Sequence, residues 1–353
     1  MALFDALLGL TVVDGDAVAI DAARRALGRA GPRDWKRARV ELRGHRLLPL
    51  VAQALRGSEL AGSLPDFARE DLEDSFRATL LANTIQLGLL RELLGAFDEA
   101  GLRPIVMKGL AVAVRYYPDI GTRPMIDVDL LVDASEEADA KRLLEERRFE
   151  RSAPWRSFLH ADHEFAVDLH AGSPSFLEEG VEALTAPFEL DERARSLEPH
   201  AMLVQLLTHM RKHTSVVGVS LLWIVDVLRL VHAEGANLSL ERVRELSREA
   251  STADLLLQVL LFGETYCRFA VPEQFRAACA GSAPLSLPWL LRQRRLKGWG
   301  FPRRRFYVRY AARVARLRPY AQRPRLRWDD IPQGWLDLVL DRRTTAQSMG
   351  SSR

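Results

Sequence analysis

The stretch Ile126-Asp127-Val128-Asp129-Leu130-Leu131-Val132 alternates side-chain character through its first half. Apolar residues occupy positions 126, 128, 130 and 132, which is the period of two expected of a β-strand. Both carboxylates therefore leave one face, roughly 6–7 Å apart, and at an effective dielectric of about 20 their repulsion is on the order of 2.5 kcal/mol. A buried strand with this penalty needs a cation between the carboxylates, and a hard divalent ion such as Mg²⁺ suits such oxygen ligands.

The residues upstream of this strand indicate a second strand and a helix. Positions 104–107 form a short apolar strand, and Lys108-Gly109 follows it directly and opens a helix over 110–117. A glycine at the start of that helix lets backbone N–H groups approach a phosphate, which the helix N-terminus also favours. The loop 119–124 then carries Arg123 and leads into the aspartate strand.

A third carboxylate follows on another expected strand. Positions 134–147 predict a helix with Ser135 as its N-cap, and positions 164–170 predict a strand. Apolar residues occupy 165, 167 and 169, so Asp168 and His170 share the other face of that strand. Carboxylates from adjacent strands can converge on one sheet face, an arrangement that suits two metal ions roughly 3.5–4 Å apart in phosphoryl transfer.

The sequence period divides the chain into four regions. Helical periodicity characterises 1–98, a core that contains the strands is expected over 99–198, helical periodicity returns over 199–345, and the serine-containing end 346–353 is expected to be disordered. Gly101 is expected to end the last N-terminal helix, and no sustained strand is expected after residue 175. The expected fold class is α+β.

Composition limits the classes of protein and partner. The 353 residues suffice for two or three domains, and a net charge of +3 does not imply strong polyanion binding by the whole chain. Cys267 and Cys279 lack metal-site spacing and are expected to be thiols in a reducing compartment. The start Met-Ala-Leu-Phe-Asp lacks the basic region of a signal peptide, and no apolar stretch reaches membrane-span length. A cytoplasmic protein with no membrane partner is therefore expected.

Several runs of this sequence resemble one known family. They are Ile105-Val106-Met107-Lys108-Gly109-Leu110-Ala111, Tyr117-Pro118, Gly121-Thr122-Arg123, Asp127-Val128-Asp129-Leu130-Leu131-Val132 and Val167-Asp168-Leu169-His170. Together they resemble the uncharacterised nucleotidyltransferase family of the DNA polymerase β-like nucleotidyltransferase superfamily, over about residues 35–235. The wider superfamily has Gly-Ser or Gly-Gly where this chain has Lys108-Gly109.

The resemblance implies a polymerase β-like mixed sheet flanked by helical regions, and a Mg²⁺-dependent nucleotidyltransferase. Asp127 and Asp129 would hold two metal ions, while Asp168 would complete the ion nearer the acceptor and help deprotonate the attacking hydroxyl. Lys108-Gly109 and Arg123 would bind the triphosphate of a nucleoside triphosphate such as ATP. The products would be a nucleoside-monophosphate adduct and pyrophosphate.

The acceptor is expected to be a small molecule or a peptide, and the family's place in natural-product and polysaccharide pathways suggests tailoring. One alternative with the same fold is adenylylation of a protein partner. Another is a non-catalytic module that binds nucleotide or nucleic acid through the arginine-rich segment 292–327. An amphipathic helix that covers apolar surface explains this segment better, so nucleic acid is not the favoured partner.

Two cationic side chains and one histidine of the candidate site also have structural interpretations that involve neither catalysis nor ligand binding. Lys108 could be a solvated lysine at a strand end, and Arg123 could simply pair with Asp119 or Asp127. For His170, a structural histidine is favoured over a proton carrier.

Three further polar residues lie in the C-terminal helices. His209 and His213 are four residues apart on one helix face and are expected to face a cleft or an interdomain surface rather than to bind metal. Asp226, within an apolar helix, is expected to bond to a neighbouring helix or to line the substrate side.

Overall fold

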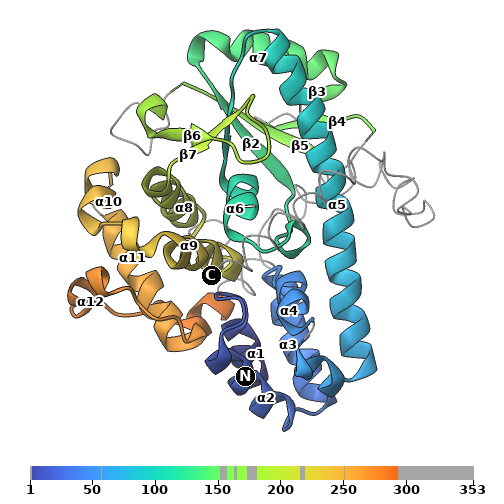
Figure 1. Cartoon of the computed structure of the whole chain (residues 1–353), viewed down its shortest axis with the longest axis vertical. Coiled ribbons are helices and arrows are strands. Elements are labelled where there is room, and N and C mark those ends of the chain that lie inside the picture. Colours follow the sequence, from blue (N-terminus) through green and yellow to red (C-terminus); the bar gives the residue numbers. More distant parts are fainter. Residues whose placement is uncertain are drawn as a thin grey trace, which may run out of the picture.

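The fold is known from a computed structural model, which describes residues 2–56, 58–151, 157–162, 165–172, 181–214, 219–249 and 251–292. The N-terminal region is helical, and its elements are α1 (Ala2–Gly9), α2 (Ala17–Leu27), α3 (Pro32–Gly44), α4 (Leu48–Leu55), the 3-10 turn η1 (Glu59–Ser63) and α5 (Asp66–Glu99). At 1.5 Å per residue, the 34-residue helix α5 is about 50 Å long. It runs along one side of the molecule from the N-terminal helices to the sheet (Figure 1).

A mixed seven-stranded sheet occupies the middle of the described chain. Its strands are β1 (Ile105–Met107), β2 (Asp127–Val132), β3 (Phe149–Arg151), β4 (Ser157–His160), β5 (Ala166–Ala171), β6 (Thr185–Pro187) and β7 (Arg195–Leu197). The strand order is β3-β4-β5-β2-β1-β7-β6. The pairs β2–β5 and β1–β7 are parallel and the other pairs are antiparallel. The predicted α+β class, with a mixed sheet between helical regions, is confirmed.

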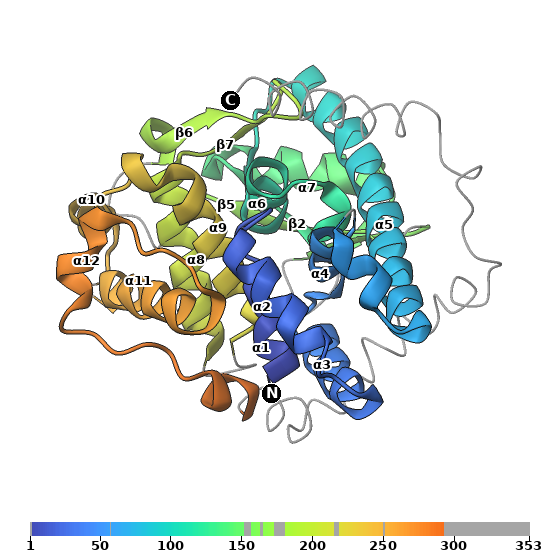
Figure 2. The same cartoon turned by 60° about the horizontal axis from the view of Figure 1, so that its bottom comes forward.

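Helices connect the strands and enclose the sheet. Between the strands lie α6 (Lys108–Tyr116), η2 (Ile120–Thr122), η3 (Ala134–Glu136), α7 (Glu137–Glu146) and η4 (Val181–Leu184). After the sheet come α8 (Pro199–Thr214), α9 (Leu221–Glu234), η5 (Gly235–Asn237), α10 (Leu240–Leu246), α11 (Ser251–Phe262), the π-turn η6 (Gly263–Cys267) and α12 (Glu273–Cys279). In two views α8 and α9 lie between α6 and the outer helices α10–α12 (Figures 1 and 2). Both α8 and α9 contact α6, which itself contacts β1 and β2.

The predicted elements around the sheet agree with the structure except in local detail. The helix expected over 110–117 already begins at Lys108. The N-cap expected at Ser135 is wrong, because the Asp133 side chain accepts hydrogen bonds from both the backbone N–H and the hydroxyl of Ser135 and caps the turn η3 instead. Strands β3, β4, β6 and β7 were not predicted, since three or four residues are too short to reveal a period of two. Gly101 ends α5 with a φ of +78°, as predicted.

One apolar core joins the three structured regions. It includes Leu50 from α4, Val128 from β2 and Leu228 from α9, each at most 1% exposed. The predicted division at 98 and 198 falls close to the end of α5 and the start of α8, and it stays a prediction. The arginine-rich segment after Arg292 and the tail 346–353 lie outside the described residues. Within the described ranges, the search for a helix long and apolar enough to cross a membrane finds none.

Candidate active site

The aspartates of β2 share one face of the strand with Asp168. In the parallel pair β2–β5, Asp129 stands directly opposite Asp168, and Asp127 precedes Asp129 by two residues. Residues opposite each other in a sheet point to the same side, so all three carboxylates belong to one face. On the other face Val128 and Leu130 are buried, and this contrast orients the strand. The predicted convergence of these three residues on one face agrees with this register.

Asp129 is the centre of the polar contacts on this face. It is only 6% exposed, and its Oδ1 atom accepts hydrogen bonds from Lys108 Nζ and, at 2.9 Å, from His170 Nε2. Burial alone would raise the pKa of Asp129, but the hydrogen bond from His170 and the charge and hydrogen bond of Lys108 outweigh burial and lower it. Asp129 is therefore ionised at neutral pH and neutralised by side chains of the chain itself.

The pKa of Asp127 is shifted in the opposite direction from that of Asp129. Dehydration by the surrounding protein, followed by the charges of Asp129 and Asp168, raises its pKa to about 6, although the residue keeps solvent contact at the start of β2. The charges of Lys108 and Arg46 act against this shift. At neutral pH Asp127 is thus an ionised carboxylate with more negative than positive charge around it, which is a favourable place for a cation.

We expect Asp127→Asn to stabilise the folded protein without metal. Ionisation of a carboxyl whose folded-state pKa of about 6 exceeds its ordinary value of 3.8 costs stability, and this cost grows as the pH rises from 3.8 to about 6 and is constant above that range. The substitution removes the cost, by about 1 kcal/mol once solvent contact is allowed for. The midpoint of thermal unfolding in EDTA should therefore rise by about 2 °C at pH 8 and by less at pH 4.5. An equal shift at both pH values would refute this electrostatic account.

Asp168 is held by a neighbouring strand. The hydroxyl of Ser157, which lies opposite Asp168 in the antiparallel pair β4–β5, donates a hydrogen bond to Asp168 Oδ1. This bond fixes one oxygen of the carboxylate, and the other oxygen is oriented by it. Ser157 precedes Asp168 by eleven residues in an irregular part of the sequence, so no periodic signal pointed to it.

The turn at Lys108-Gly109 brings a cation next to Asp129 through an uncommon backbone conformation. Lys108 has a φ of +50°, in the left-handed region that non-glycine residues rarely adopt, and its backbone N–H donates to Gln205 Oε1 at 3.2 Å. Arg46, whose charge also acts on Asp127, has a φ of +61°. Such conformations cost free energy and cluster at functional sites. Nothing in the sequence pattern around Arg46 marked this residue.

Arg123 forms an ion pair with a residue that the sequence analysis did not name as its partner. Its Nε and Nη2 atoms donate to the two oxygens of Asp226, both at 2.7 Å, and Tyr117 Oη donates to the same carboxylate at 2.6 Å. Asp226, and not the expected Asp119 or Asp127, accepts these two hydrogen bonds, while the Asp119 side chain caps the turn η2. Burial lowers the pKa of Arg123, but the adjacent Asp226 outweighs burial and raises it. Asp226 therefore bonds to a neighbouring segment, as expected.

Gly109 is explained by the approach of this arginine. A Cβ atom at position 109 would lie 2.7 Å from Arg123 Nη1, which is closer than side chains tolerate. Arg123 is thus stacked against the start of α6 and only 6% exposed. Its contact with a triphosphate stays a prediction, as does the approach of a phosphate to the Gly109 backbone.

The carboxylate set suits Mg²⁺ in its chemistry. Three carboxylates from two adjacent strands offer the hard oxygen ligands that this ion prefers, and Asp127 lacks a compensating partner of comparable strength. As the side chains stand in the described ranges, no three residues of the His, Cys, Asp and Glu types are grouped to hold a metal ion. Lys108 and His170 both lie on Asp129 Oδ1, so Lys108 would have to leave that oxygen for an ion to share it with Asp127.

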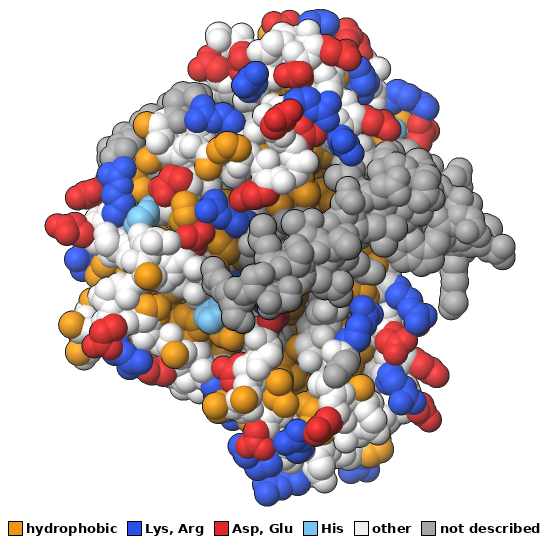
Figure 3. Space-filling view, viewed as in Figure 1, with side chains coloured by type: hydrophobic (Ala, Val, Ile, Leu, Met, Phe, Trp, Pro, Cys, Tyr) orange, Lys and Arg blue, Asp and Glu red, His pale blue; other side chains and the backbone are white. Residues whose placement is uncertain are grey.

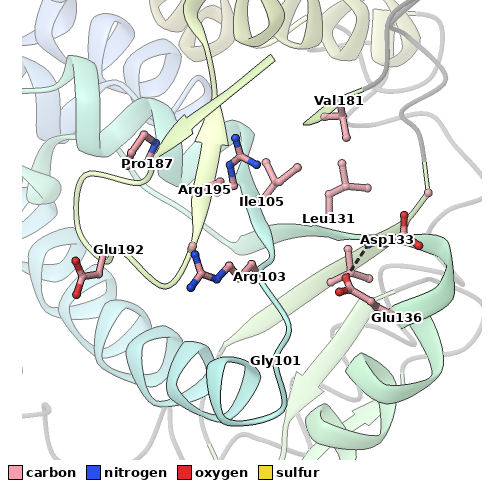
Figure 4. Close-up of a pocket in the computed structure, with 13 residues that line it drawn as sticks. Gly101, Arg103, Ile105, Leu131, Asp133, Glu136, Val181, Pro187, Glu192 and Arg195 are labelled. Atoms are coloured by element: carbon pink, nitrogen blue, oxygen red, sulfur yellow. Dashed lines mark hydrogen bonds between the residues drawn. The ribbon is translucent and has the colours of Figure 1, made fainter. Parts of the chain in front are cut away.

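A cavity of about 590 Å³ is lined by residues of β1, β2 and β7 and of the segments around them (Figure 4). Ile105 and Leu131 form its floor, and Leu131 is two residues along β2 from Asp129 on the same side. Charged residues of both signs line the cavity, and they are Arg103, Asp133, Glu136, Glu192 and Arg195. The space-filling view shows acidic and basic side chains interspersed on the face of the molecule that it presents (Figure 3). The cavity is large enough for a polar small molecule.

Comparison with known proteins gives a family and two partial structural likenesses. The model of a family described as "Uncharacterised nucleotidyltransferase" matches residues 31–267, and no curated protein matches. The solution structure of the antibiotic-resistance factor ANT(2'')-Ia is 19% identical, with a TM-score of 0.33, over 46% of this chain and 89% of that chain. The crystal structure of ANT(2'')-Ia with adenylyl-2''-tobramycin is 18% identical, with a TM-score of 0.33, over 43% of this chain and 91% of that chain. Likenesses at this TM-score carry no weight for the substrate of this chain.

Proposed function

We propose that this chain, which belongs to the uncharacterised nucleotidyltransferase family, transfers a nucleoside monophosphate from a nucleoside triphosphate to a hydroxyl of a small-molecule or peptide acceptor with Mg²⁺. The observation that carries the proposal is the cluster of Asp127, Asp129 and Asp168 on one sheet face, with the Lys108 ammonium against it. Tailoring of a natural product is the setting that the family resemblance suggests for such a reaction.

Each side chain has a role in this reaction that follows from its contacts. The acceptor oxygen attacks the α-phosphorus, the bond from that phosphorus to the bridging oxygen breaks, and pyrophosphate leaves with the electron pair. Asp168 receives the hydroxyl proton, and Ser157 orients its carboxylate for this. Mg²⁺, held by the three aspartates, would neutralise the phosphates and lower the pKa of the acceptor hydroxyl.

Cationic side chains of the protein supply the remaining positive charge that compensates the triphosphate. Lys108 would move from Asp129 to the triphosphate as the ion takes its place, so one ammonium serves both states. The charge of Arg46 acts on Asp127, so Arg46 would add positive charge near the bound phosphates. Arg123 acts chiefly by holding the start of α6 in place, because Asp226 occupies two of its nitrogens.

The cavity on the same face supports a small polar acceptor. Its floor continues the row of side chains that carries Asp129, and His170 lies opposite Leu131 between the carboxylates and the cavity. An acceptor seated there would present a hydroxyl toward Asp168. Its lining of both acidic and basic residues suits a molecule with polar groups of more than one kind. Adenylylation of a protein partner is the alternative reaction. Intact-mass spectrometry distinguishes it, because the added nucleotide would then be found on a protein.

Calorimetric titration with the four common nucleoside triphosphates tests the proposal. We expect at least one to bind in the presence of Mg²⁺ and to bind at least about tenfold more weakly in EDTA, because the metal joins the carboxylates to the phosphates. Asp168→Asn should reduce the metal dependence, whereas Asp139→Asn on the exposed face of α7 should leave it unchanged. Binding that ignores Mg²⁺, or no binding of any of the four, would overturn the proposal.

A further inference from the structure

Three aromatic side chains from α8 and α9 form a cluster that the reaction above does not use. The rings of His209 and His213 lie 4.5 Å apart, and Trp223 lies 4.9 Å from His209 and 5.7 Å from His213. Trp223 and His209 meet nearly edge to face, at 83°. All three residues are half-buried rather than enclosed in the core, so part of each remains available to a ligand.

Helix α8, which carries two of the three rings, contacts the turn at Lys108 through Gln205. Gln205 on α8 accepts a hydrogen bond from the Lys108 backbone N–H at 3.2 Å, and its amide group contacts the sulfur of Met107 at 3.0 Å. His209 and His213 follow Gln205 at intervals of four residues, so they continue the same face of α8, about 6 Å further along at each step. The ring cluster therefore extends directly away from the candidate triphosphate site.

The charge state of the cluster suits stacking rather than ion binding. Burial, then the nearby positive charges of Lys108 and His213, lower the pKa of His209 to about 3. His209 is consequently a neutral imidazole at physiological pH, and its flat face beside the Trp223 indole is an apolar aromatic surface. A nucleobase presents a complementary aromatic face, which every base possesses.

We propose that Trp223, with His209 and His213, forms the wall on which the base of the nucleoside triphosphate stacks. The phosphates then lie at Lys108 and the carboxylates, and the ribose spans the interval between Lys108 and the rings. Aromatic stacking gives affinity with little discrimination between bases, so this wall selects a nucleotide over bare polyphosphate. The inference rests on the proposed function and adds the part of the site that recognises the base.

Parallel titrations with Mg²⁺ and either a nucleoside triphosphate or inorganic tripolyphosphate test the wall. Trp223→Leu keeps an apolar side chain but removes the aromatic face, and Trp223→Phe keeps a smaller one. We expect the leucine variant to bind the nucleotide about tenfold more weakly and tripolyphosphate within twofold of the parent. The phenylalanine variant should retain most nucleotide affinity. Trp289→Ala, which removes an exposed tryptophan of the chain's C-terminal side, is the matched control and should change neither affinity.

The outcomes separate the wall from the proposed function. Unchanged nucleotide affinity in Trp223→Leu would overturn the wall while leaving nucleotide binding by the parent intact. Equal loss of nucleotide and tripolyphosphate affinity would overturn it too, because a structural role moves both ligands together. Failure of the parent to bind nucleotide with Mg²⁺ would instead remove the proposed function itself.

Discussion

Asp129→Asn is expected to reduce pyrophosphate release from a nucleoside triphosphate by at least about 100-fold. Asp129 is the carboxylate flanked on one strand by Asp127 and across the sheet by Asp168, so it is the residue best placed to share an ion with both. Asparagine has the same shape but lacks the negative charge that a hard cation requires. The loss should therefore be in turnover, measured as pyrophosphate released with water as the acceptor.

Controls for this substitution must separate the loss of a metal ligand from a change in the fold. Asp129 accepts from Lys108 and His170, and asparagine keeps one carbonyl oxygen for those donors, so circular dichroism should show an unchanged fold. Asp139→Asn removes an aspartate from the exposed side of α7 and should leave pyrophosphate release at the parental rate. Pyrophosphate release by Asp129→Asn at close to the parental rate would refute a metal role for this carboxylate.

The sequence predicted the parts of the site that lie within periodic segments. Alternation over 126–132 and 164–170 is enough to assign Asp127, Asp129 and Asp168 to one face of each strand, because side-chain direction in a strand follows from position alone. What alternation does not contain is the pairing of the two strands, which puts Asp129 opposite Asp168. The sequence analysis expected only that carboxylates from adjacent strands could converge, and the register of β2 and β5 supplies the pairing itself.

The remaining contacts could not be predicted because they join residues far apart in the chain. Arg123 and Asp226 are 103 positions apart, and the sequence offered nearer acids of equal charge. The choice among them depends on how α9 is placed against η2 and α6, which is decided by the shared apolar core. The same holds for Gln205 at Lys108 and for Trp223 at His209, since no local pattern distinguishes them from other helical residues.

Arg123→Ala is expected to be the most destabilising single change at the site. Asp226 is fully buried, and loss of the guanidinium leaves its charge with only the Tyr117 hydroxyl as a hydrogen-bond donor among the contacts described above. Breaking a buried ion pair by removal of one partner costs about 3–5 kcal/mol. Thermal unfolding should accordingly show a midpoint lower by about 10 °C.

A comparison of variants distinguishes an unpaired buried charge from simple loss of contacts. If the cost arises from the charge left on Asp226, then Asp226→Leu combined with Arg123→Met should recover more than half of the lost stability, because both charges leave the interior together. If the cost arose from lost contacts, Arg123→Met alone would recover as much stability as the double variant, although it leaves the charge of Asp226 unpaired. Arg142→Ala, at an exposed ion pair on α7, should leave the midpoint unchanged and calibrates the surface effect. Recovery in the double variant without recovery of turnover would mean that Arg123 serves the reaction as well as the fold, because Arg123→Met cannot restore Nη1 beside Gly109.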